Sequence, residues 1–154
     1  MVKQKKSALA KATDLLAAQE QSSNVLRRKL LARKYDAAEV DDALAKLQQY
    51  NYLDDAEACR RQFEIFYAEG KLGVRQIAAK LIRRGFDKDF IDGLIPDDAD
   101  AHDLTVAARL LEKKFTRGKV ERAKAWQFLA ARGFDGETVT AALDNFTGGD
   151  NFAD

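Results

Sequence analysis

The stretch Leu47-Gln-Gln-Tyr-Asn-Tyr-Leu-Asp-Asp-Ala-Glu-Ala-Cys-Arg-Arg-Gln-Phe63 contains the end of one helical unit and the start of the next. Asn51 is expected to end the first helix, because asparagine tolerates the left-handed conformation at a helix C-terminus. Tyr52 and Leu53 follow as a short apolar plug. Asp54 suits the N-cap of the next helix, because its carboxylate can accept a hydrogen bond from a free backbone amide. The units on both sides look alike, so this joint sets the architecture.

Three segments of the chain, 26–36, 77–87 and 125–135, have similar sequences when aligned without a gap. Their spacing is 51 positions from residue 26 to residue 77, and 48 positions from residue 77 to residue 125. Self-similarity at such a period indicates a repeat protein. A leucine, an arginine, an aromatic residue, an aspartate and a β-branched residue coincide in this register: Leu30, Leu81 and Leu129; Arg33, Arg84 and Arg132; Tyr35, Phe86 and Phe134; Asp36, Asp87 and Asp135; Val40, Ile91 and Val139.

Each repeat is expected to form three helices, and no strand is predicted. The sequence pattern predicts first helices at Ala8–Gln19, Asp54–Glu69 and Asp100–Lys114, second helices at Ser22–Arg33, Gly73–Arg84 and Gly118–Ala131, and third helices at Asp36–Gln49, Asp87–Leu94 and Asp135–Asn145. We therefore predict an all-α fold of three tandem three-helix repeats in an elongated, curved arrangement. The predicted repeats span residues 1–50, 51–96 and 97–146, and a flexible C-terminal tail spans residues 147–154.

Glycine ends two of the predicted second helices. Gly85 and Gly133 are C-terminal stops, and the aromatic residue and aspartate that follow each of them are expected to act as a hydrophobic staple and an N-cap for the third helix. Lys34 replaces glycine in the first repeat, so the helix C-terminus there should be less relaxed.

Composition indicates a soluble helical protein. The chain has 154 residues, of which 46% are hydrophobic and 33% charged, and no segment approaches the length needed to span a bilayer. The only cysteine, Cys59, allows no intramolecular disulfide, which suits a reducing compartment. The basic segment Met1–Lys6 is not followed by an apolar core of signal-peptide length. We therefore expect a cytoplasmic monomer that does not contact membrane.

The charges are segregated although the formal net charge is only +1. The second helices are basic, and the third helices begin with acidic residues. If the repeats stack in register, the second helices form a basic band that can attract a polyanion. We predict that this band binds the partner through Arg27, Arg28, Lys29, Arg33, Arg75, Lys80, Arg83, Arg84, Lys119, Arg122, Lys124 and Arg132.

A structural interpretation of the same residues remains open. Lys29 and Arg33 lie three positions after Leu26 and Leu30, so their long stems can cover the edge of the core while their charges stay in water. Basic residues late in a helix also complement the helix dipole. We favour the binding band because all three repeats share the pattern.

No residue set indicates catalysis, a metal or a cofactor. His102 is expected to be a surface histidine, and the adjacent pair Asp54-Asp55 to serve as cap and dipole partner. Cys59 has no neighbouring base. Trp126, with Phe128 and Phe134, is assigned to the core rather than to a stacking platform. The chain is therefore expected to be a binding module that is not an enzyme.

Three motifs resemble the signature of the RecX family, bacterial regulatory proteins that bind the recombinase RecA. They are Tyr52-Leu-Asp-Asp55, Glu69-Gly-Lys-Leu-Gly-Val-Arg-Gln-Ile77 and Leu81-Ile-Arg-Arg-Gly-Phe86. The resemblance covers nearly the whole chain, since Leu26-Arg-Arg-Lys-Leu30 and Lys124-Ala-Trp-Gln-Phe-Leu-Ala-Ala-Arg-Gly-Phe134 fit the other repeats of the family. Asn51 stands where the family usually has glycine.

The resemblance implies a negative regulator of RecA that acts in DNA repair, recombination and the SOS response. Such a protein would bind the RecA–DNA filament, in its helical groove or at its growing end. It would inhibit filament extension and the ATPase, strand-exchange and coprotease activities. The implied partners are the RecA filament and the single-stranded DNA within or near it, with no cofactor.

Two other functions stay open at this stage. A protein of helix-turn-helix type could bind DNA directly through its basic second helices, and its binding would weaken steeply with salt. An enzyme could instead hold a site between the repeats, formed by titratable groups with perturbed pKa values.

Overall fold

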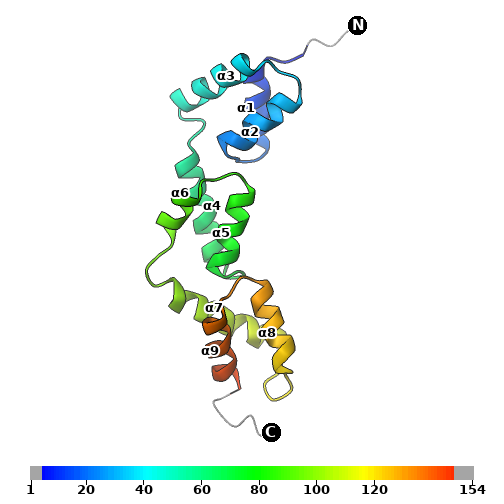
Figure 1. The fold of residues 1–154 in the computed structure, drawn as a ribbon, viewed down its shortest axis with the longest axis vertical. Helices are drawn as coiled ribbons and strands as arrows, with labels where there is room; N and C mark the ends of the chain where they lie inside the picture. Colours follow the sequence, from blue (N-terminus) through cyan, green and yellow to red (C-terminus); the bar gives the residue numbers. More distant parts are fainter. Residues whose placement is uncertain (1–4, 148–154) are drawn as a thin grey trace. The chain divides into compact units, whose positions relative to one another are not determined.

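The computed structural model describes residues 5–147, and all of the regular secondary structure in this range is helical (Figure 1). The helices are α1 (Ala8–Ala18), α2 (Ser23–Ala32), α3 (Ala37–Gln49), α4 (Asp55–Glu69), α5 (Val74–Arg83), α6 (Lys88–Leu94), α7 (Ala99–Lys114), α8 (Arg122–Ala131) and α9 (Gly136–Phe146). The prediction of an all-α fold is therefore confirmed. Most of the predicted C-terminal tail lies outside the described residues.

One predicted helix start is wrong. The second helix of the last repeat begins at Arg122 rather than at Gly118. Gly118 has a φ of +80°, and the amide of Lys119 donates to the carbonyl of Thr116 in a turn. A residue with positive φ cannot continue a right-handed helix, so α8 begins only after this turn.

The predicted helix caps are mostly confirmed. The carboxylate of Asp54 accepts from the amide of Glu57 at 3.1 Å, and Asp135 accepts from Thr138 at 2.8 Å. Asp36 occupies the N-cap position of α3 without a side-chain hydrogen bond. Asn51 ends its helical unit with a φ of +61°, as the sequence predicts.

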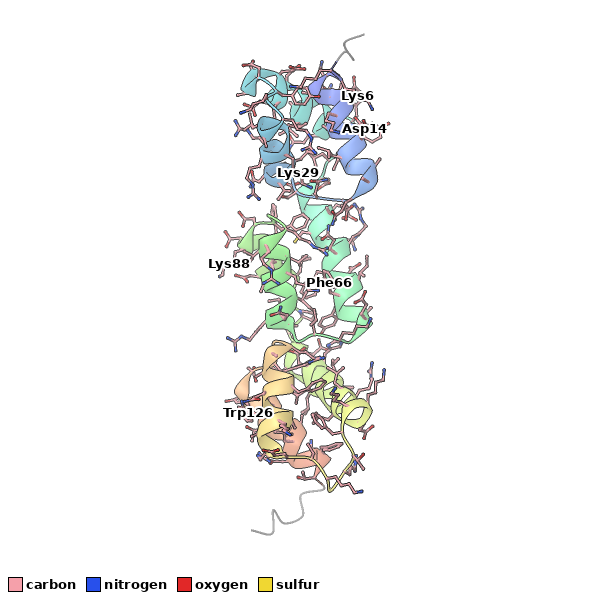
Figure 2. All side chains as sticks on the ribbon, turned by 90° about the vertical axis from the view of Figure 1, so that its right-hand side faces the viewer. Lys6, Asp14, Lys29, Phe66, Lys88 and Trp126 are labelled. Atoms are coloured by element: carbon pink, nitrogen blue, oxygen red, sulfur yellow. The ribbon has the colours of Figure 1, made fainter. Side chains whose placement is uncertain are left out.

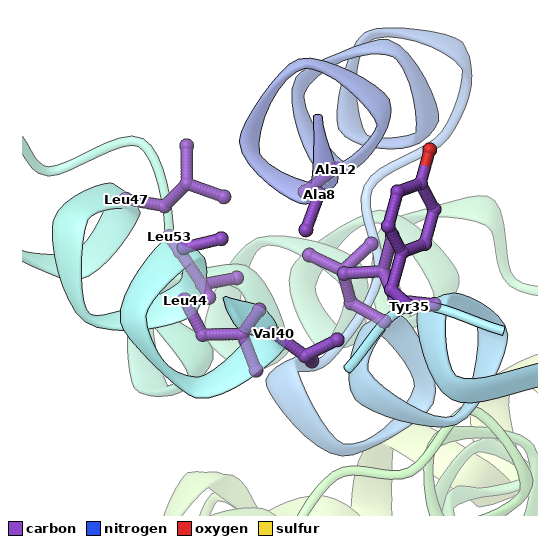
Figure 3. Packing of buried hydrophobic residues seen from close by; sticks show 10 residues of the cluster. Ala8, Ala12, Tyr35, Val40, Leu44, Leu47 and Leu53 are labelled. Atoms are coloured by element: carbon purple, nitrogen blue, oxygen red, sulfur yellow. The ribbon is translucent and has the colours of Figure 1, made fainter. Parts of the chain in front are cut away.

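The repeat register also predicts the core. Leu30, Leu81 and Leu129 are all fully buried, as are the three β-branched residues of the same register, Val40, Ile91 and Val139. Figure 3 shows the cluster of the first repeat, where α1 contributes Ala8 and Ala12 and α3 contributes Val40, Leu44 and Leu47.

The apolar plug is only half confirmed. Leu53 belongs to the core of the first repeat, but Tyr52 is 74% exposed.

The chain divides into two compact units, and the division cuts through the middle predicted repeat. One unit contains residues up to 62 together with 81–91, and the other contains residues 63–80 together with those from 92 onward. In the first unit α1 and α2 pack on α3, and in the second α7 and α8 pack on α9. Helices α4 and α5 contribute residues to both units. The boundaries of the three repeats stay a prediction.

A joint between successive repeats lies inside the first unit. Asp55, in the first turn of α4, accepts a hydrogen bond from the amide of Ser23, the first residue of α2, at 2.9 Å. Gly85 lies so close to α2 that a Cβ on it would be 2.4 Å from Ser22 Oγ and 2.6 Å from Val25 Cγ2. A carboxylate at a helix N-terminus satisfies free amides and complements the dipole.

The second unit contains the same joint one repeat later. Asp103 of α7 accepts from the amide of Val74, the first residue of α5, at 3.1 Å. A Cβ on Gly133 would be 2.4 Å from Gln76 Cβ. Asp103 and Gly133 each follow their counterparts Asp55 and Gly85 by 48 positions, the spacing of the second and third repeats. The carboxylate and the glycine therefore form a recurrent connection between repeats.

This joint explains why glycine is replaced at one of the three helix stops. Lys34 has the left-handed conformation expected there, with a φ of +69°. Its side chain is exposed, whereas a side chain at Gly85 or Gly133 would collide with the start of a second helix. Lys34 therefore carries only the cost of the left-handed backbone.

Candidate partner-binding surface

The basic residues predicted to bind a partner all retain solvent contact. On α2, Arg28 and Arg33 are exposed and Arg27 and Lys29 are half-buried. The others divide in the same way: Arg75, Arg83, Lys119 and Lys124 are exposed, and Lys80, Arg84, Arg122 and Arg132 are half-buried. Their side-chain contacts separate residues with a structural role from residues available to a partner.

The one basic position that recurs in all three repeats has a structural role. Arg33 donates to the carbonyl of Lys29 at 3.1 Å, and Arg132 donates to the carbonyl of Phe128 at 3.2 Å. Both bonds satisfy carbonyls that the last turn of a helix leaves free. Arg84 instead donates to the side-chain oxygen of Gln62 at 2.6 Å. These contacts support the structural interpretation for this position.

Ion pairs occupy part of the basic band. Arg27 Nε lies 2.8 Å from Asp41 Oδ1, an α2–α3 contact that raises the pKa of Arg27 and lowers the pKa of Asp41. Arg122 pairs with Asp144 of α9 at 3.1 Å. The basic second helices and acidic third helices thus neutralise each other locally. Exposed pairs of this kind are weak, so a polyanion could compete for the cations.

Aromatic rings contact two of the cations. Lys80 Nζ lies 5.0 Å from the ring centroid of Phe66 on α4, and Arg132 Cζ lies 3.8 Å from that of Phe128. These distances are within the range of a cation–π interaction. The two side chains therefore also help to cover aromatic surface.

Four exposed members of the predicted set make neither an ion pair nor a side-chain hydrogen bond within the described part of the chain: Arg28, Arg75, Arg83 and Lys119. The pKa of Asp135 lies below its ordinary value, mainly because of hydrogen bonds from Thr138. The positive charge of Arg75 makes a smaller contribution in the same direction. These four, which we call the unpaired cations, are the members of the predicted set best suited to meet a partner.

The assignment of Trp126 to the core is wrong. Trp126 lies on α8 (Figure 2) and is 37% exposed, whereas Phe134 is buried and Phe128 is half-buried. The register explains the difference, because Ala125 and Leu129 face the core and Trp126 lies beside that stripe. Trp126 also lines a cavity of about 440 Å³ together with Arg75 and Gln76.

His102 is not the surface residue that the sequence suggests. Its ring stacks on Tyr67 of α4 with 3.7 Å between centroids, and its side chain is 29% exposed. The next residue, Asp103, is buried, and burial raises the pKa of its carboxyl despite the hydrogen bond from Val74. Asp103 is not identified from the sequence as part of the joint between repeats. The alignment of Asp103 with Asp55 is the signal that could have indicated this role.

Little in the described residues suggests metal or thiol chemistry. No group of three histidine, cysteine or carboxylate side chains in this range is placed to hold a metal ion. Cys59 is buried, and burial raises the pKa of its thiol. Of the helices in residues 5–147, none has both the length and the apolar character needed to cross a membrane.

The fold is that of a helical repeat protein, and the exposed cations are its predicted binding surface. The model of the RecX first three-helix domain matches residues 8–47, and that of the RecX third three-helix domain matches residues 102–143. Regulatory protein RecX of Neisseria gonorrhoeae is 32% identical over 92% of both chains, and that of Thermus thermophilus is 35% identical over 82% of this chain and 83% of its own. The chain therefore belongs to the RecX family of regulatory proteins.

Solved structures agree with this fold. The crystal structure of RecX from Lactobacillus salivarius matches 90% of this chain and 94% of its own, with a TM-score of 0.76 at 15% identity. A second crystal structure, of a regulatory protein RecX, matches 89% of this chain and 71% of its own, with a TM-score of 0.75 at 22% identity.

Proposed function

We propose that this protein is a negative regulator of RecA that acts by binding the RecA–DNA filament. It lodges in the helical groove or at the growing end and inhibits filament extension, ATPase, strand exchange and coprotease activity. The observation that carries the proposal is the similarity to Regulatory protein RecX of N. gonorrhoeae over 92% of both chains. The action is that of a cytoplasmic binding protein, without catalysis by this chain.

The unpaired cations support a polyanionic partner. A filament on DNA presents phosphates, and exposed arginine and lysine side chains attract them even when the total charge of a protein is near zero. Arg28, Arg75 and Arg83 lie on two of the three second helices, and Lys119 lies just before the third. The contact would therefore draw on all three predicted repeats.

The direct test is the ATPase activity of RecA on single-stranded DNA, titrated with this protein. Increasing concentrations should lower the ATPase rate, and a pull-down with single-stranded DNA and ATP should recover RecA. The same pull-down without DNA and ATP shows whether the filament is needed. A protein that neither retains RecA nor changes its ATPase rate would rule out the proposed function.

Direct DNA binding through the basic second helices is the second candidate, and the exposed, unpaired Arg28, Arg75 and Arg83 favour it. It requires binding to naked DNA that weakens steeply with salt. Strong binding of this kind, with no effect of the protein on RecA, would favour it over regulation of the filament.

A further inference from the structure

The second compact unit contains a cavity of about 440 Å³ that is lined by aromatic, amide and guanidinium groups. Its lining comes from the start of α5, from the exposed side of α8 and from the loop that leads into α9. Arg75, Gln76 and Trp126 supply its functional side chains. The rest of the lining consists of Ala130, Gly133, Phe134, Gly136 and Val139.

Trp126 offers an aromatic surface at this cavity. It is 37% exposed, although tryptophan is a residue that proteins generally bury to a large extent. The edge of its six-membered ring rests near Gly136, where a Cβ would lie 3.9 Å from Cη2 and Cζ2. Contact at one edge supports the ring while leaving part of it open to a ligand.

Arg75 and Gln76 supply polar groups beside the tryptophan. Arg75 is exposed and has no ion-pair partner among the described residues. The side-chain amide of Gln76 makes no hydrogen bond within the same range, so both its donor and its acceptor are available. An amide can bind the polar edge of a base, and a guanidinium can bind a phosphate.

The neighbouring charges indicate which contact dominates. Asp135 caps α9 through Thr138, and Glu137 lies in the first turn of the same helix. These carboxylates weaken the attraction that Arg75 exerts on a phosphate. Stacking on Trp126 should therefore contribute more than the ionic contact, and it does not depend strongly on base identity.

We propose that this cavity binds one unpaired base of single-stranded DNA. The base stacks on Trp126, its edge meets the amide of Gln76, and the adjoining phosphate meets Arg75. Bases of a duplex are stacked on each other and cannot enter, so the site selects single strands. The inference rests on the proposed function, because the RecA filament brings single-stranded DNA to the protein. An apolar side chain of a partner protein is the competing occupant.

The first test uses the full wild-type chain, because Trp126 is the only tryptophan in the sequence. Oligothymidine is titrated against the intrinsic fluorescence of the protein in the absence of RecA. Stacking should quench the emission in a saturable way. An abasic oligonucleotide of the same length carries the same phosphates, and it should bind with little quenching.

Variants then separate stacking from ionic attraction, with affinity measured by the anisotropy of labelled oligothymidine. Trp126→Ala should weaken binding at least about fivefold, and Trp126→Phe should recover part of that loss. Arg75→Ala should weaken oligothymidine and the abasic strand alike. Each variant is compared with the wild type by its melting curve, and Trp126→Phe keeps the test valid if the alanine variant unfolds.

Three results would overturn the inference. One is binding of oligothymidine without a change in tryptophan emission, another is equal quenching by the abasic strand, and the third is a change in emission on adding RecA without DNA. The last would assign the cavity to a protein side chain. RecA inhibition that survives Trp126→Ala would leave the proposed function intact while this site fails.

Discussion

At the scale of single residues, Asp103 shows that a buried carboxylate has two opposing effects at the joint. It supplies the acceptor for the amide of Val74, because Gly73 at the preceding position has no side chain to do so. Gly73 must lack one, since its Cβ would be 2.4 Å from the carbonyl oxygen of Gly133. Burial disfavours the charge and raises the pKa of Asp103.

We predict opposite outcomes for two substitutions of Asp103. Asp103→Ala removes the acceptor and should cost about 1 kcal/mol of unfolding free energy, as lost caps do. Asp103→Asn keeps an oxygen for Val74 and removes the buried charge, so it should match or exceed the wild type at neutral pH.

The stability difference between Asp103→Asn and the wild type should depend on pH in a predictable direction. A raised folded-state pKa means that the Asp103 contribution is fully present below the unfolded value, near pH 3.8, and declines as pH rises through the folded value. The advantage of Asp103→Asn should therefore grow from acid to neutral pH in chemical denaturation. An advantage that is constant with pH, or an asparagine variant as unstable as the alanine variant, would contradict this account.

Two glycines with positive φ provide a second residue-scale prediction. Gly118 has a φ of +80° and no neighbour within 4 Å of a Cβ, so Gly118→Ala should cost only the left-handed backbone, about 1–2 kcal/mol. Gly133 has a φ of +85° and meets the backbone of Gln76 as well. Gly133→Ala should therefore cost clearly more in thermal or chemical unfolding. Equal losses in the two variants would show that the joint relaxes to admit a methyl group.

At the scale of helices, the sequence predicts what depends on local pattern. Asn51 and Asp54 mark a helix end and a helix start because the chemistry lies within a few positions. The pattern does not predict the start of α8, because it includes Gly118 in a helix, and the positive φ of Gly118 excludes that. Hydrogen bonds across the joint, such as that from the Ser23 amide to the Asp55 carboxylate, join residues 32 positions apart and have no local sequence pattern.

The exposure of Trp126 could not be predicted for a different reason from the hydrogen bonds of the joint. Aromatic residues near a helical stripe are most often core, and the sequence alone cannot show how wide that stripe is. Ala125 and Leu129 fill the space toward α9 and leave Trp126 beside the cavity. Which basic residues are unpaired depends likewise on contacts between helices, such as Arg27 with Asp41.

The register of the repeats makes an element-scale prediction. Leu30 and Leu81 occupy equivalent positions on α2 and α5 and are fully buried. Leu30→Ala and Leu81→Ala should each cost about 2–5 kcal/mol, as truncations of buried leucines do. Ile82→Ala is a matched control on α5, since Ile82 is 47% exposed and should cost much less. Similar losses at Leu81 and Ile82 would show that the helix is not oriented as described.

At the scale of the whole molecule, side-chain contacts divide the predicted basic residues into those with a structural role and those available to a partner. Structural contacts hold Arg33, Arg84 and Arg132, and ion pairs hold Arg27 and Arg122. The unpaired cations are therefore expected to account for most of the attraction to a filament. These contacts narrow the basic band predicted from sequence to four positions: Arg28 on α2, Arg75 and Arg83 on α5, and Lys119 just before α8.

Charge reversal at two of these positions tests that account. Arg75→Glu with Arg83→Glu should leave the melting curve nearly unchanged and weaken inhibition of the RecA ATPase by roughly tenfold or more, because reversal adds repulsion as well as removing attraction. Lys113→Glu with Lys114→Glu makes the same change of charge on α7, outside the second helices, and should retain inhibition.

A single variant and the dependence on salt distinguish the unpaired cations from the Trp126 cavity. Arg83 does not line the Trp126 cavity. A loss of inhibition in the single variant Arg83→Glu therefore cannot be caused by a change in that cavity. Wild-type inhibition should weaken as salt rises, and the double variant should depend on salt less steeply, because fewer phosphate contacts release fewer counterions. A well-folded Arg75→Glu/Arg83→Glu protein that inhibits fully would show that Arg75 and Arg83 face solvent on the filament. The contact would then have to involve Arg28, Lys119 or the first and third helices of the repeats.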